Sequence, residues 1–72
     1  MKVKIGIITV SDRASKGIYE DISGPAIIDT LNDYLSTPWE ADYQVIPDEQ
    51  YLIESTIKQM ADKDKCCLIV TT

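Results

Sequence analysis

Three short polar segments follow the most strand-like stretches of the sequence and carry its candidate chemistry. They are Ser11, Asp12 and Arg13 after the first stretch, Asp48 after the second, and Thr71 and Thr72 at the end of the third. In an open parallel sheet, ligands bind beyond the carboxyl ends of the strands, so these segments would meet at one edge. Each segment also has an ordinary interpretation, as turn residues, a helix cap and strand residues, respectively.

The first of these segments opens a long connection, residues 11–24, where a strand-to-helix loop usually has about 2–6 residues. Its hydroxyl groups, glycine N–H groups and the basic side chains of Arg13 and Lys16 could hold phosphate. Its carboxylates, Glu20 and Asp21, are ligands that suit Mg²⁺. The sequence has no histidine, which removes imidazole acid–base chemistry and most transition-metal chemistry from consideration. Neither of the two standard glycine-rich nucleotide motifs occurs in it.

Composition limits the partners and the compartment. The 72 residues include seven basic and twelve acidic side chains, for a net charge of −5. Such a balance is unfavourable for binding a nucleic-acid backbone, so nucleic acid is not an expected partner. The N-terminal apolar stretch is too short for a signal peptide or a membrane span, which predicts a cytoplasmic protein. Neighbouring Cys66 and Cys67 are interpreted as small apolar residues that open a strand.

Hydrophobic periodicity predicts an α/β fold of the order β-α-β-α-β. Strands are expected at residues 3–10, 40–46 and 67–72, joined by right-handed crossovers into a parallel sheet with helices on both faces. The first and last strands are apolar throughout while the middle one alternates, so strand order 2-1-3 is favoured. That order leaves the last strand at an open edge, which natural domains cover. We therefore expect the chain to be incomplete.

Two helices are predicted between these strands. Their apolar stripes are Ile27, Ile28, Leu31, Tyr34 and Leu35 in the first, and Leu52, Ile53, Ile57 and Met60 in the second. Ser23, just ahead of Gly24 and Pro25, is the expected N-cap of the first helix, and Asp48 that of the second.

Four separated motifs carry a resemblance to a known family. They occupy residues 9–21, 23–25, 46–49 and 68–72, and in order and spacing they resemble the start of the molybdopterin adenylyltransferases of molybdenum cofactor biosynthesis. In that family the final Thr-Thr pair leads into a glycine-rich nucleotide loop. The resemblance implies that residues 1–72 are the N-terminal part of a single larger α/β domain. It also implies that this chain stops before that loop and is inactive alone.

The resemblance also implies a reaction and a set of site residues. The reaction is adenylyl transfer from Mg²⁺-ATP to the phosphate of molybdopterin, which releases pyrophosphate, with Mg²⁺ as the cofactor and no metal ligands assigned. Asp48 matches a catalytic aspartate of the family. The substrate-binding residues would be Ser11, Asp12, Arg13, Asp21, Ser23, Gly24, Thr71 and Thr72. A homotrimer is the implied assembly.

Other functions remain open at this point. A flavodoxin-like module could hold FMN through the hydroxyl-rich loop, and a scaffold or molybdopterin-binding role needs no catalysis. A phosphoacceptor receiver domain fits less well, because Thr71 and Thr72 stand where its third strand should end in aspartate.

Overall fold

The chain alternates between strands and helices, as the sequence predicts. The computed structural model describes residues 3–18 and 20–72. In chain order the elements are β1 (Val3–Val10), α1 (Asp12–Ser15), α2 (Ser23–Tyr34), β2 (Trp39–Ile46), α3 (Gln50–Asp62) and β3 (Leu68–Thr71). The short helix α1, which lies inside the long loop after β1, was not expected from the sequence.

The three strands form one parallel sheet in the order β2-β1-β3, which confirms the predicted topology. Strand β1 pairs with β2 along its whole length and with β3 from Ile5 to Ile8. Its apolar side chains are the most deeply buried of the sheet, because neighbours cover it on both sides. Among the described residues, β2 and β3 each pair on one side only.

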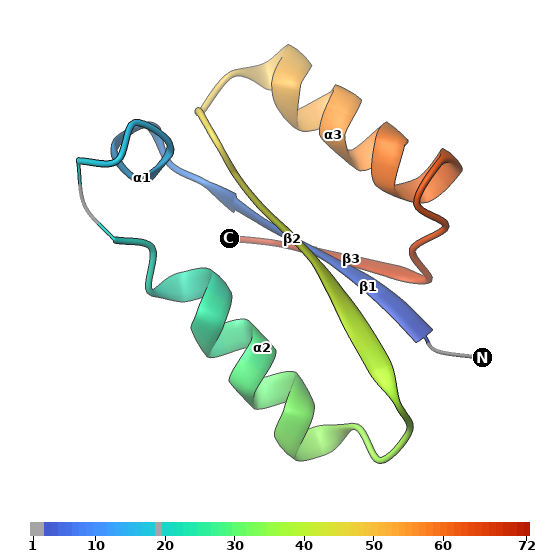
Figure 1. Ribbon diagram of the computed structural model, residues 1–72. Helices are drawn as coiled ribbons and strands as arrows, with labels where there is room; N and C mark the ends of the chain where they lie inside the picture. The colour runs from blue at the N-terminus through green and yellow to red at the C-terminus, as the bar shows by residue number, and fades with distance from the viewer. Residues whose placement is uncertain (1–2, 19) are drawn as a thin grey trace.

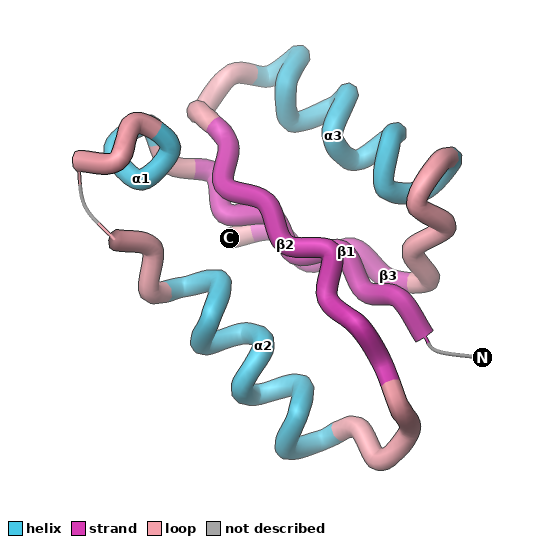
Figure 2. Tube along the Cα trace, in the orientation of Figure 1, coloured by secondary structure: helices cyan, strands magenta, loops and turns pink. Residues whose placement is uncertain are grey.

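The elements form three layers. Helix α2 covers one face of the sheet and α3 covers the other, while α1 lies just beyond the carboxyl end of β1 (Figure 1). The tube view shows the strands crossing between the two long helices (Figure 2). The carboxyl ends of the strands therefore share one edge, where the loops after β1 and β2 begin.

The main core lies between the sheet and α3. Ile8, Ile46 and Met60 form its buried cluster, and Ile53 and Ile57 of α3 pack against it. Close packing here depends on Gly6 of β1, where a Cβ atom would lie only 2.6 Å from the sulfur of Met60. The predicted apolar stripe of this helix is confirmed.

The α2 layer is more open, and one residue of its predicted stripe is exposed. Ile27, Ile28 and Leu31 are half-buried, whereas Tyr34 is 82% exposed. Tyr34 is the last residue of α2, and the next residue, Leu35, already has an extended backbone. The prediction of a buried Tyr34 was therefore wrong, because the chain leaves the helix at this point.

Both predicted helix caps were also wrong. The N-cap of α2 is Ile22, and the carboxylate of Asp21 accepts the N–H groups of Ser23 and Gly24, each at 3.2 Å. The N-cap of α3 is Glu49, and its side chain makes no capping bond. A side chain placed just upstream of α2 thus replaces the expected serine cap, and Asp48 is left outside its helix.

The two cysteines lie before β3 and are free thiols. Cys66 is half-buried against the α3 core, and Cys67 is exposed. Within residues 3–18 and 20–72, no helix has both the length and the apolar character needed to cross a membrane.

Candidate functional site

Backbone hydrogen bonds join the ends of all three strands at the carboxyl edge. The N–H of Ser11 donates to the carbonyl of Ile46, and the N–H of Val10 donates to the carbonyl of Thr72, each at 2.9 Å. Thr72 in turn donates its N–H to Ile8 at 2.9 Å. The three segments singled out in the sequence therefore lie along one edge of the sheet, as predicted.

The loop after β1 is held by a local cap and a long-range bond. The hydroxyl of Ser11 accepts the N–H of Ala14 at 3.2 Å and so caps α1. One residue on, Oδ1 of Asp12 accepts the backbone N–H of Asp48 at 2.9 Å. This bond places the two acidic residues beside one another beyond the ends of β1 and β2. Arg13 is exposed on the same short helix.

A second cluster surrounds Asp21 at the start of α2. Its Oδ2 atom accepts the hydroxyl of Thr9 at 2.8 Å and a short hydrogen bond from the phenol of Tyr43. The same carboxylate accepts the N–H groups of Ser23 and Gly24. One carboxylate thus links β1, β2 and the first turn of α2.

These hydrogen bonds set the ionisation of both partners. Burial acts to raise the pKa of Asp21, but the hydrogen bonds from Tyr43, Thr9 and the two N–H groups outweigh it and lower that pKa below 3.8. Burial and the neighbouring Asp21 carboxylate raise the pKa of Tyr43 from 10.0 to about 12. At neutral pH the carboxylate is therefore charged and the phenol is a proton donor.

Gly24 is needed for this cluster to close. A Cβ atom at position 24 would lie 2.7 Å from Oδ2 of Asp21 and 2.9 Å from Cζ of Tyr43. Both distances are shorter than an ordinary van der Waals contact, so any side chain here would push the ring or the carboxylate away. The close approach of Tyr43 explains why a buried glycine stands in the first turn of α2.

The structure divides the predicted site residues into two groups. Ser11, Asp12, Asp48 and Thr72 meet at the strand ends, and Asp21, Ser23 and Gly24 form the cluster at α2. Thr71 ends β3 opposite Ile8 of β1.

Sequence reasoning did not select Thr9 or Tyr43 as site residues. The only available signal was a tyrosine in a half-buried strand, since the hydroxyl of such a tyrosine usually finds a hydrogen-bond partner.

No ready-made metal centre is present in the part of the chain that the structure describes. Among these residues, no group of three or more histidine, cysteine, aspartate or glutamate side chains is arranged to hold a metal ion. Mg²⁺ commonly binds through substrate phosphates and only one or two carboxylates. Asp12 and Asp48 are neighbouring residues that carry two such carboxylates.

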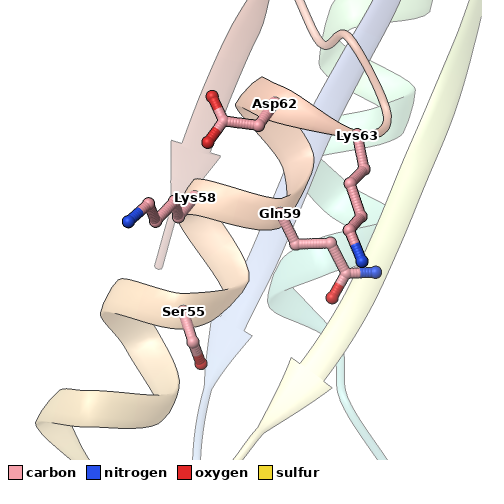
Figure 3. A pocket seen from close by; sticks show the side chains of 5 residues that line it. All are labelled: Ser55, Lys58, Gln59, Asp62 and Lys63. Atoms are coloured by element: carbon pink, nitrogen blue, oxygen red, sulfur yellow. The ribbon is translucent and has the colours of Figure 1, made fainter.

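A hollow on α3 is separate from this edge. Ser55, Lys58, Gln59, Asp62 and Lys63 line it (Figure 3). All come from α3 and the residue after it, so a single helix forms the depression. Helix α3 runs back from the carboxyl edge, which places this hollow toward the opposite end of the sheet (Figure 1).

Comparison with known proteins gives consistent results. No protein-family model matches the chain. A molybdopterin adenylyltransferase of Helicobacter pylori is 49% identical over 70 residues, which cover 97% of this chain and 40% of that protein. The Escherichia coli protein of the same name is 43% identical, with 97% and 36% covered, and the Pyrococcus furiosus protein is 36% identical, with 96% and 38% covered.

A solved structure agrees with these sequence matches. The crystal structure of the molybdopterin biosynthesis enzyme MoaB from Thermus thermophilus has a TM-score of 0.81 and 33% identity, covering 96% of this chain and 42% of that one. This chain thus spans about two fifths of the length of the relatives it matches. The resemblance predicted from the motifs is confirmed: over 97% of its length the chain is a homologue of proteins named molybdopterin adenylyltransferase.

Proposed function

We propose that the full-length chain carrying these residues acts in molybdenum cofactor biosynthesis by transferring an adenylyl group from Mg²⁺-ATP to molybdopterin. The names of the homologues support this reaction class and substrate. The observation that carries the proposal is the bond between Asp12 and the backbone of Asp48, which holds two acidic residues at the edge where parallel sheets bind ligands.

The reaction needs positioning more than proton transfer. A phosphate oxygen of molybdopterin attacks the α-phosphorus of ATP, the bond from that phosphorus to the bridging oxygen breaks, and pyrophosphate leaves. The attacking phosphate is already ionised, so no general base is required. Alignment of the two anions and neutralisation of their charge supply the rate enhancement.

Individual residues take roles that follow from their places at the edge. Asp48 orients the Mg²⁺-ATP substrate, with Asp12 fixing its loop. Ser11 and Thr72 line the same edge, and Arg13 on α1 contributes positive charge toward the phosphates. An acidic chain of net charge −5 repels free triphosphate, so we expect nucleotide to bind as its magnesium complex.

The relatives are much longer than the part matched here, and activity is proposed for the full-length chain only. We expect residues 1–72 alone to be inactive, because the family resemblance places the nucleotide loop after Thr72. The homotrimer and the cytoplasmic location are proposals that rest on the same resemblance and on the sequence.

The test is a product assay on the purified full-length chain. We expect ATP and molybdopterin to give adenylylated molybdopterin and pyrophosphate with Mg²⁺, and no product without it. Absence of product under both conditions would reject the enzyme and favour a binding or scaffold role. A protein that is yellow on purification would favour the flavodoxin-like alternative.

Calorimetry tests the role of the metal separately. ATP should bind the full-length chain more tightly in the presence of Mg²⁺, since the metal offsets the acidic field. Equal affinity in the two titrations would remove Mg²⁺ from the binding step.

A further inference from the structure

The hydrogen bonds around Asp21 join parts of the chain that are distant in sequence. Thr9 belongs to β1 and Tyr43 to β2, and both side chains donate to Oδ2 of Asp21. Tyr43 pairs in register with Ile7, so it projects from the same face of the sheet as Thr9, which is the α2 face. A buried threonine, 5% exposed, and a tyrosine from the next strand thus converge on one carboxylate.

The same carboxylate occupies the N-terminus of α2. The N–H groups of Ser23 and Gly24 donate to Asp21, Pro25 has no N–H, and Ala26 donates to Ile22. Every backbone donor of this first turn is therefore accounted for. Helix N-termini commonly bind phosphate, but here a side chain of the protein itself already takes that position.

This arrangement also sets the course of the long loop after β1. The loop is fixed at its start, where Ser11 bonds to Ile46 and caps α1, and at its end, where Asp21 bonds to both strands. Arg13 on α1 is held near the first attachment, where Asp12 also bonds to Asp48, whereas Asp21 fixes the point at which the chain enters α2. Loss of the second attachment would loosen the end of the loop that enters α2 without removing any residue from the strand ends.

We propose that Thr9 and Tyr43 are positioning residues for the adenylyl transfer proposed above. They hold the carboxylate of Asp21 at the N-terminus of α2 and so fix the loop after β1 against the sheet. The inference rests on the proposed function for its catalytic part. We then expect a substrate phosphate to bind on the Ser11 side of the edge, because the backbone N–H groups in the first turn of α2 are already bonded within the protein.

The test compares matched variants of the full-length chain. Tyr43→Phe removes one hydroxyl and leaves the ring that packs on Gly24, while Tyr34→Phe makes the same change on an 82% exposed tyrosine. Thr9→Val removes the second hydroxyl and keeps the shape of the side chain, whereas Thr9→Ser retains the hydroxyl. Amide hydrogen exchange at Ser23 and Gly24 reports the bonds directly, and steady-state kinetics report their effect on the reaction.

We expect exchange at Ser23 and Gly24 to accelerate on the order of tenfold in Tyr43→Phe and in Thr9→Val, as for loss of one hydrogen bond to a charged group. The same variants should raise KM on the order of tenfold with a smaller change in kcat, because loop position affects ground-state and transition-state binding alike. Tyr34→Phe should match the wild type in both measurements. Thr9→Ser, which keeps the hydroxyl, should lie closer to the wild type than Thr9→Val does.

Two outcomes would overturn the proposal. Unchanged exchange at Ser23 and Gly24 in Tyr43→Phe would show that Tyr43 does not hold Asp21. Faster exchange with unaltered KM and kcat would show that the bonds stabilise the fold but do not position substrate. A wild-type protein without adenylyl transfer would instead reject the proposed function, and the exchange data would still decide whether the attachment exists.

Discussion

The backbone N–H of Asp48 donates to Oδ1 of Asp12 over 2.9 Å, although the two residues are 36 positions apart in the chain. The bond crosses from the loop after β2 to the helix after β1. It engages the main chain of Asp48 and leaves its carboxylate outside α3, whose N-cap is Glu49. Asp48 therefore does not cap α3, and its carboxylate is the group for which we propose a role in orienting the substrate.

Asp48→Asn should therefore separate chemistry from stability. The backbone bond to Asp12 does not involve the side chain, so we expect a melting temperature close to that of the wild type. Adenylyl transfer by the full-length chain should fall on the order of 100-fold, as for loss of one positioning electrostatic group. Asp33→Asn, at an exposed position of α2, is the control. Wild-type turnover in Asp48→Asn would remove this residue from the site.

Asp12→Ala tests the other end of the same bond. Loss of one acceptor at an exposed position should lower the free energy of unfolding by about 1 kcal/mol, measured by urea denaturation. The loss of turnover, expressed as an increase in activation free energy, should exceed this loss of stability, because the loop that carries Asp48 loses its attachment. A variant with normal kinetics and reduced stability would limit the bond to a structural role.

Gly24→Ala should destabilise the fold despite the better helix propensity of alanine. The added methyl would overlap Tyr43 and Asp21, and such overpacking typically costs about 1–3 kcal/mol. Replacing the ring with a smaller side chain, in Gly24→Ala with Tyr43→Leu, should recover part of the packing loss. A double-mutant cycle in urea gives the coupling, and strictly additive effects would contradict the contact.

Asp42→Asn should stabilise the protein at neutral pH. The hydrogen bond with Asp64, burial and the charge of Asp64 raise the pKa of Asp42 above 3.8. A raised pKa means that the contribution of this carboxyl is fully present below pH 3.8 and is lost as pH rises through the folded value. The Tm difference between Asp42→Asn and the wild type should therefore shrink as pH falls toward 4.

The control for this comparison is Asp64→Asn, which relieves the same repulsion from the other side. The effects of the two substitutions on Tm should not be additive, because either one alone removes the repulsion between the carboxylates of Asp42 and Asp64. A Tm difference for Asp42→Asn that stays constant between pH 7 and pH 4 would rule out the raised pKa of Asp42.

The sequence was sufficient to predict the sheet and much of its edge. Strand β1 is apolar on both faces, which predicted its central place, and the alternation in β2 predicted an outer one. The meeting of Asp12 and Asp48 followed from a general property of parallel sheets, whose carboxyl ends share one edge. These features depend on hydrophobic periodicity and on the order of strands and helices along the chain, and the local sequence indicates both.

The cluster around Asp21 could not be predicted in this way. Its bond to Tyr43 depends on the register of β2 against β1 and on how the intervening loop folds back over the sheet. Neither quantity leaves a local pattern. The wrong N-caps have the same origin, since Ser23 is a good cap by residue type but Asp21 reaches the same N–H groups from outside the helix.

Of the three strands, the ribosome synthesises the central strand β1 first and its second neighbour β3 last. Ile5 of β1 pairs with Leu68 of β3 across almost the whole chain, with β2 and both long helices between them in sequence. Contacts of such long range are slow to form, because the chain loses the entropy of a large loop before pairing begins. During synthesis, β1 can pair with β2 while one of its sides still lacks a partner. We expect this half-paired strand to be the species most prone to aggregation before β3 leaves the ribosome.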